Sequence, residues 1–167
     1  MPGWLTNRMI YGLAFAVIAG LMGFAFYLQY VEGLEPCPLC MAQRIAFVTL
    51  GLVFLIAFLH GPEKVGTIIY TSLGGLVALA GLSLAIRQLW LQSLPEDQVP
   101  ACGPGLEYML EVFPMSEVIT MMLKGTGECA EVQWTFLGVS IPGWTALAFV
   151  GFIAVLLFTF MRKQGNA

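Results

Sequence analysis

Two cysteines, Cys37 and Cys40, stand at positions i and i+3 in the segment EPCPLCMAQR, directly before a long apolar run. Pro38 favours the first turn of a helix, which puts Cys37 at the cap and Cys40 near unpaired amides at the positive end of the helix dipole. That location favours the thiolate form of a cysteine. Arg44 lies one helical turn beyond Cys40 on the same face. The segment therefore predicts reactive sulfur beside a fixed positive charge.

Cys102 and Cys129 form a second candidate pair, 27 positions apart in one long polar loop. This separation is too large for a local redox motif, but it suits a disulfide that closes a long segment. Both pairs are also compatible with inert staples in a non-catalytic tetraspan scaffold. That alternative explains Cys37 and Cys40 poorly, because closing two intervening residues removes little loop entropy.

A zinc site is a third interpretation of the cysteines, since four thiolates satisfy tetrahedral coordination. The spacing is a single CxxC plus two isolated cysteines, and the one histidine, His60, is not near them in the sequence. An oxidising compartment also favours disulfides over thiolate ligands. We expect no metal site.

The elements that position these residues are membrane spans. Of the 167 residues, 59% are hydrophobic and 10% are charged, a composition far more apolar than that of a soluble domain. Lipid offers no partner to backbone amides, so spans are helices or barrel strands, and the apolar runs are too long for strands. We predict an all-α bundle of four transmembrane helices, one membrane domain over residues 1–167 with no nucleic-acid partner, whose spans cover about 9–30, 41–59, 67–86 and 141–161.

The first and third spans carry small residues at which neighbouring helices can approach closely. We interpret them as packing features rather than ligand sites. They are Gly12, Ala16, Gly20 and Gly23 in the first span, and Gly74, Gly75, Ala78 and Gly81 in the third.

An even number of spans puts both termini on one side of the membrane. That side carries four of the seven basic residues, which weakly favours a cytoplasmic location for the termini. All four cysteines fall on the other side, in loops at about 31–40 and 92–140, which indicates an oxidising compartment there. In a bacterium that compartment is the periplasm.

The second loop contains a short amphipathic segment. Apolar residues recur at helical spacing up to Pro114 and again beyond it, with Ser116 as the expected cap and Gly125 as the expected stop. We expect a helix lying flat on the bilayer, and two roles stay open for it, alone or together: a cover for the end of the bundle, or a hinge for the loop cysteines. Its apolar residues are Leu106, Met109, Leu110, Phe113, Val118, Met121 and Met122.

Taken in order, these motifs resemble one known family. A CxxC before the second of four spans, an arginine four residues later, then PACG and GECAEVQWTFLGVSIPGW in the second loop are similar to the DsbB family of bacterial inner-membrane disulfide bond formation proteins. The resemblance runs from Gln29 through the last span. It implies a thiol oxidase that takes two electrons from a reduced periplasmic DsbA, a thioredoxin-fold protein, and delivers them to a quinone, either ubiquinone or menaquinone.

The resemblance also implies roles for the cysteines. Cys102 and Cys129 form the pair that meets DsbA, with Cys102 as the attacked sulfur, and Cys37 and Cys40 form the pair beside the quinone. Cys40 supplies the thiolate that contacts the quinone ring. Because thiol exchange requires contact between pairs, the two loops must meet, and we expect an interloop bond between Cys37 and Cys102.

For the quinone itself, the resemblance implies that Arg44 sits against a quinone oxygen and that Gln29 lines the site. Some members of the family have a histidine near the periplasmic end of the third span that is linked to the quinone, whereas the histidine of this chain, His60, lies in the opposite turn. The third span offers Arg87, Gln88, Trp90 and Gln92 in its place, and the sequence does not choose among them. A paralogue of the DsbI kind, serving one dedicated client, is the alternative within the same chemistry.

Overall fold

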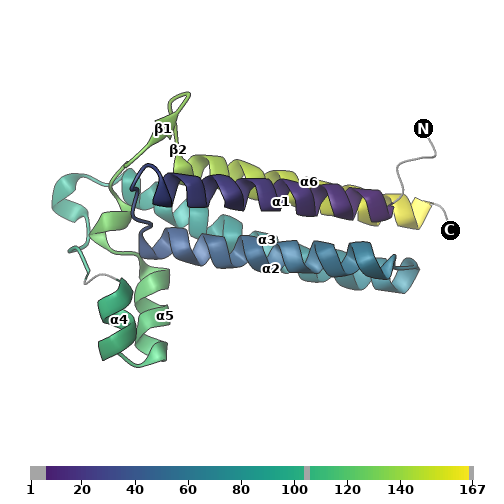
Figure 1. Cartoon of the computed structure of the whole chain (residues 1–167), viewed down its shortest axis with the longest axis horizontal. Helices are drawn as coiled ribbons and strands as arrows, with labels where there is room; N and C mark the ends of the chain where they lie inside the picture. Colours follow the sequence, from purple (N-terminus) through teal and green to yellow (C-terminus); the bar gives the residue numbers. More distant parts are fainter. Residues whose placement is uncertain (1–6, 104–105, 166–167) are drawn as a thin grey trace.

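Four long helices run antiparallel alongside one another and make up most of the computed structural model, which describes residues 7–103 and 106–165 (Figure 1). They are α1 (Asn7–Tyr30), α2 (Pro38–His60), α3 (Lys64–Gln92) and α6 (Ile141–Gly165). Each is long and apolar enough to cross a membrane. The predicted four-span bundle is therefore confirmed. The expected domain also included residues 1–6, 104–105 and 166–167, which lie outside the described residues.

The bundle is held by an apolar core between successive helices, with α1 packed on α2, α2 on α3 and α3 on α6. At its centre the ring of Phe47 stacks on that of Phe149, with centroids 4.2 Å apart. Large apolar side chains such as Leu13, Leu76 and Leu147 point outward, as a lipid-facing surface requires. The buried core residues are Tyr11, Ala14, Ile18, Phe47, Leu50, Phe54, Ala57, Ala78, Phe149, Phe152 and Leu156.

Some of the small residues do allow close helix approach. A Cβ added at Gly81 would lie 2.2 Å from Cζ of Phe149, and one at Gly12 would lie 2.9 Å from Cδ2 of Phe58. Gly74 and Ala78 also face neighbouring helices. The packing interpretation is wrong for Gly20, Gly23 and Gly75, because a Cβ there would meet no described atom within 4 Å. Ala16 is exposed.

Helix α2 begins and ends at residues suited to those positions. Cys37 caps its first turn, with Sγ accepting a hydrogen bond from the Cys40 amide at 3.4 Å, and Pro38 follows at the first helical position. At the other end Gly61 adopts a left-handed conformation and donates its N–H to the Ala57 carbonyl at 3.0 Å. The reactive segment is therefore fixed to a rigid span.

The second loop contains two short helices rather than one, α4 (Leu106–Val112) and α5 (Met115–Lys124). Ser116 is not the cap: Pro114, in an extended conformation, precedes α5 directly, and no side chain caps that end. The expected stop is correct, since α5 ends at Gly125. Met109 and Val118 are buried, whereas the side chains of Leu106 and Leu110 lie outside the described part of the structure.

The two loop helices lie at the end of the bundle opposite the start of α1 and the end of α6, with axes that cross the direction of the spans (Figure 1). The one-turn helices η1 (Glu96–Gln98) and η2 (Gly127–Cys129) flank them. A hairpin of β1 (Thr135–Phe136) and β2 (Val139–Ser140) then leads into α6. Its two turn residues, Leu137 and Gly138, both have positive φ, as a tight hairpin turn requires.

Candidate functional site

Cys37 and Cys40 face one another at the start of α2. Their Sγ atoms lie 3.1 Å apart, about 1 Å more than the S–S bond of about 2.05 Å. All four cysteines of the chain are free thiols in this structure. The pair is therefore held close enough for a disulfide to form with little movement of the backbone.

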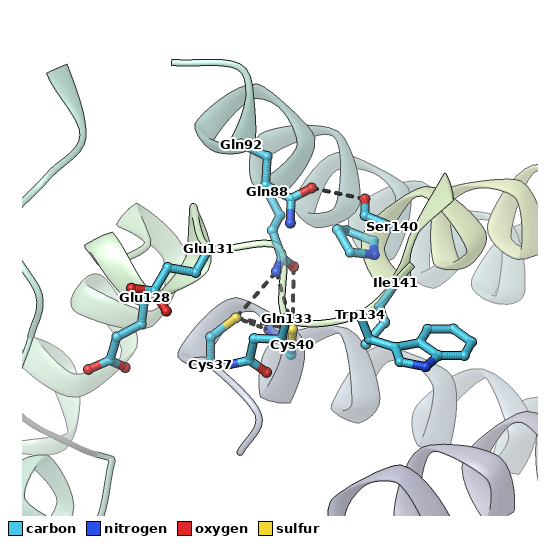
Figure 2. A pocket seen from close by; sticks show the side chains of 11 residues that line it. Cys37, Cys40, Gln88, Gln92, Glu128, Glu131, Gln133, Trp134, Ser140 and Ile141 are labelled. Carbon is cyan, nitrogen blue, oxygen red and sulfur yellow. Dashed lines mark hydrogen bonds between the residues drawn. The ribbon is translucent and has the colours of Figure 1, made fainter. Parts of the chain in front are cut away.

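Gln88 is the third-span residue that reaches these sulfurs. Its Nε2 lies 3.3 Å from Sγ of Cys37 and 3.2 Å from Sγ of Cys40, and its side chain is buried (Figure 2). Gln92, one turn further on, instead accepts a hydrogen bond from the Ser140 hydroxyl at 2.9 Å. Of the four third-span residues that the sequence offered, Gln88 is the one with a hydrogen bond to these sulfurs.

A signal in the sequence was available for Gln88. The buried face of α3 advances in steps of three and four residues through Ala78, Gly81 and Ala85, and the next step reaches Gln88. The predicted span ended at about residue 86 because hydropathy falls there. The helix itself continues to Gln92, so the sequence named Gln88 as a candidate without placing it on the buried face of α3.

Cys129 is the third sulfur of this cluster. It is fully buried with Cys37, Leu39 and Leu91. Hydrogen bonding from Cys37 lowers the pKa of Cys129 to about 6 against the opposing effect of burial, with further hydrogen bonds from Leu39 and Thr126. The same interaction, together with the contact to Cys40 and burial, raises the pKa of Cys37. Cys129 therefore ionises more readily than Cys37, the cysteine against which it is buried.

Cys102, in contrast, is exposed, and Cys129 rather than Cys102 occupies the position beside Cys37. The segment that carries Cys102 nevertheless lies against the one that precedes Cys129. The Gly127 amide donates to the Ala101 carbonyl at 3.2 Å, and a Cβ added at Gly127 would lie 2.4 Å from the Pro100 carbonyl oxygen. The expected contact between loops is present, but through the other cysteine of the second pair.

Arg44 and Gln29 are brought together on the α1 side of α2. Arg44 donates through Nη1 to Oε1 of Gln29 and through Nη2 to the Ala25 carbonyl at 3.1 Å. Its guanidinium carbon lies 5.5 Å from the centre of the Phe26 ring. A guanidinium has five N–H donors, and these two contacts use one each, so donors remain for a ligand.

A pocket opens over the Cys37 and Cys40 sulfurs between α2, α3 and the segment that leads into α6 (Figure 2). Glu128 and Glu131 stand on one side of it and Trp134 on the other. The lining residues are Cys37, Cys40, Gln88, Gln92, Glu128, Glu131, Gln133, Trp134, Ser140, Ile141 and Pro142.

Comparison with known proteins gives a consistent result along the whole chain. Residues 7–159 match a family model described as Disulfide bond formation protein DsbB. A Hahella chejuensis protein named Disulfide bond formation protein B is 73% identical, over 98% of this chain and 99% of its own length. Proteins of the same name from Marinobacter nauticus, 58% identical over 95% of each chain, and Pseudomonas aeruginosa PAO1 (numbered 1), 46% identical over 95% of this chain and 97% of its own, also match.

Proposed function

The chain belongs to the DsbB family of membrane disulfide oxidoreductases, and from this premise we propose that it reoxidises a DsbA-like dithiol oxidase and passes the electrons to a membrane quinone. The matches do not favour the two alternatives, a paralogue with one dedicated client and a non-catalytic scaffold. The observation that carries the proposal is the burial of Cys129, with its lowered pKa, against Cys37 beside Cys40.

The first exchange takes place at Cys102. In the oxidised enzyme, a disulfide joins Cys102 to Cys129, and a thiolate of the partner attacks Sγ of Cys102 because that sulfur is exposed whereas Cys129 is buried. A mixed disulfide forms between the partner and Cys102, and Cys129 leaves as a thiolate. The lowered pKa of Cys129 makes it a good leaving group.

The second exchange transfers the electrons between the loops. In the oxidised enzyme a second disulfide joins Cys37 to Cys40. The Cys129 thiolate attacks Sγ of Cys37, which lies against it. A Cys37–Cys129 disulfide forms, the Cys37–Cys40 bond breaks, and Cys40 is released as a thiolate. The partner's second thiol then attacks the mixed disulfide at the partner's own sulfur, which frees Cys102. Attack by Cys102 on Cys129 restores the first disulfide and leaves Cys37 and Cys40 reduced, so two electrons have moved from the partner to this pair.

Arg44, Gln29 and Phe26 fit the head of a quinone by their chemistry. The Arg44 guanidinium is half-buried at the end of two spans and keeps N–H donors for a carbonyl oxygen, beside an aromatic ring. When bound, the quinone supplies the acceptor for two electrons and two protons. Arg44 would hold its oxygen, Gln29 would orient Arg44, and Cys40 would deliver the electrons one turn away on the same helix.

The proposed location is the bacterial inner membrane, with the termini in the cytoplasm and the cysteine end in the periplasm. Two features support this orientation. Both the first residues of α1 and the last of α6 lie at one end of the bundle, and the cysteine loops lie at the other (Figure 1). Disulfides persist in an oxidising compartment, which favours the periplasm for the cysteine end.

The test is quinone reduction by the purified full-length protein supplied with reduced DsbA. We expect Cys40→Ser to abolish reduction of ubiquinone or menaquinone, because no sulfur then delivers the electrons. His60→Gln is the matched control, since His60 lies at the opposite end of the bundle and should leave the rate unchanged. Quinone reduction that survives in Cys40→Ser would refute the proposed route.

A further inference from the structure

Two buried glutamines and one half-buried threonine, from three different spans, form a chain of hydrogen bonds that ends at the CxxC sulfurs. The Thr145 hydroxyl of α6 donates to Oε1 of Gln43 on α2 at 2.6 Å, and Nε2 of Gln43 donates to Oε1 of Gln88 on α3 at 2.7 Å. Nε2 of Gln88 then lies 3.2 Å from Sγ of Cys40. Gln43 and Gln88 are 3% and 2% exposed. Burying two carboxamides inside a membrane bundle is costly unless they are hydrogen-bonded, so this chain needs a reason.

The order of donors gives the chain a direction. The single proton of the Thr145 hydroxyl has two acceptors in reach, Oε1 of Gln43 at 2.6 Å and the Pro142 carbonyl at 2.9 Å. With the proton on the shorter contact, the amide nitrogen of Gln43 is left to donate to Gln88. The oxygen of Gln88 is then occupied, and its NH₂ group faces the sulfurs. Sγ of Cys40 is 3.6 Å from Oε1 of Gln88 but only 3.2 Å from Nε2, in agreement with this orientation. A donor aimed at sulfur favours an ionised sulfur, which accepts hydrogen bonds but donates none.

We propose that Gln88 is a catalytic residue that stabilises the Cys40 thiolate released when the Cys37–Cys40 disulfide opens, and that Gln43 and Thr145 are positioning residues that hold its carboxamide in the donating orientation. The two N–H groups of Gln88 are shared between the two sulfurs, so the residue also keeps the pair together when it is reduced. The inference rests on the proposed function, because it assigns how that reaction's electron-donating sulfur is kept ionised.

The test measures the pH dependence of Cys40 alkylation by iodoacetamide in the fully reduced, full-length protein, with the modified residue identified by fragment mass spectrometry. Gln88→Met keeps the length of the side chain and removes its donors. We expect alkylation of Cys40 to slow by roughly tenfold near pH 7, the factor typical of one hydrogen bond to a charged group. The rates should converge at alkaline pH, where the thiol is ionised in both proteins, whereas a change in access would slow alkylation at every pH.

Gln92→Met is the matched control, because Gln92 lines the same pocket one turn further along α3 and bonds to Ser140 instead of a sulfur. It should leave the pH profile of Cys40 unchanged. A profile for Gln88→Met that superimposes on that of the wild-type protein, or an equal shift in Gln92→Met, would overturn the role of Gln88.

Thr145→Val tests the positioning role and serves as the second variant if Gln88→Met does not fold. We expect a smaller shift in the same direction, and no further shift when Thr145→Val is added to Gln88→Met, since Thr145 acts through Gln88. Equal effects of Thr145→Val in both backgrounds would contradict that role. Alkylation requires neither quinone nor DsbA, so a wild-type protein that fails to reduce quinone would defeat the proposed function without deciding this inference.

Discussion

Cys129 of η2 is buried against Cys37 at the cap of α2, although the two residues belong to different loops. Cys102, its expected disulfide partner, is exposed. This relationship separates the two tasks of the second loop. One cysteine is accessible to a protein partner, while the other is already in place for exchange with the membrane pair. The exposure of the two sulfurs therefore agrees with the proposed order of the exchange reactions.

The first prediction concerns which loop cysteine bonds to Cys37. In a protein with Cys40→Ser and Cys102→Ser, mild oxidation should join Cys37 to Cys129, because these side chains are in contact. The matched variant, with Cys40→Ser and Cys129→Ser, leaves Cys37 and the exposed Cys102 and should cross-link far more slowly. Non-reducing electrophoresis and peptide mass spectrometry measure both. Faster cross-linking to Cys102 would contradict the arrangement.

The second prediction concerns the ionisation of Cys129, whose pKa is lowered to about 6 chiefly by the hydrogen bond from Cys37. Titration of the reduced protein by thiolate ultraviolet absorbance should reveal a group ionising near that pH, which disappears in Cys129→Ala. The thiolate is the attacking form, so exchange from Cys129 should slow as the pH falls below about 6. In Cys37→Ala the ionisation should move up towards the usual thiol range of about 8.5. An unchanged titration in that variant would exclude Cys37 as the cause.

The third prediction concerns Gly127, where the two halves of the second loop touch. In Gly127→Ala the new methyl group would lie 2.4 Å from the Pro100 carbonyl oxygen, so the segments carrying Cys102 and Cys129 must separate. We expect a loss of about 1–3 kcal/mol of stability, as for other overpacked sites, and slower oxidation of DsbA. Gly75→Ala is the control, since a methyl group there meets no described atom within 4 Å. The measurements are thermal denaturation in detergent and the rate of DsbA oxidation. Equal results for Gly127→Ala and Gly75→Ala would show that the contact at Gly127 is unimportant.

The fourth prediction concerns Arg44. Removing its charge in Arg44→Gln should raise the KM for quinone by roughly tenfold or more, the effect of losing a hydrogen bond to a charged group, and leave the KM for DsbA unchanged. Arg44→Lys keeps the charge but loses the planar guanidinium that contacts both Gln29 and Ala25. Its KM for quinone should therefore lie between the values of the wild-type protein and Arg44→Gln. A quinone KM that does not respond to either substitution would remove Arg44 from the site.

The spans and the CxxC helix could be predicted from the sequence because their signals are local. A membrane helix must be long and apolar, and Cys37, Pro38 and Gly61 mark the ends of α2 by their own conformational preferences. The extension of α3 to Gln92 was not predicted, since hydropathy reports the end of the lipid rather than the end of the helix. The prediction of Ser116 as the cap was wrong because α5 begins earlier, directly after Pro114, whose fixed φ suits the position before the first helical residue.

The contact between Cys129 and Cys37 could not be predicted from the residues alone. It depends on how a loop of nearly fifty residues, at about 92–140, closes over the end of the bundle. No local pattern near Cys129 indicates which of the two loop cysteines is buried. The contacts that decide it are non-local. Leu39 and Leu91, from two different spans, supply the apolar surface on which Cys129 is buried.

Arg87 gives the second loop a fixed point. Its Nε and Nη2 donate to the Lys124 carbonyl at 3.2 Å and 3.0 Å, and the next residue, Gly125, fits so tightly that a Cβ there would lie 2.6 Å from Leu91 and 2.8 Å from Leu39. The chain directly after α5 is thus held by the hydrogen bonds of Arg87 and by its close packing on Leu91 and Leu39. This attachment lies between α5 and Cys129, so we expect a movement of α4 and α5 to leave Cys129 in place against Cys37.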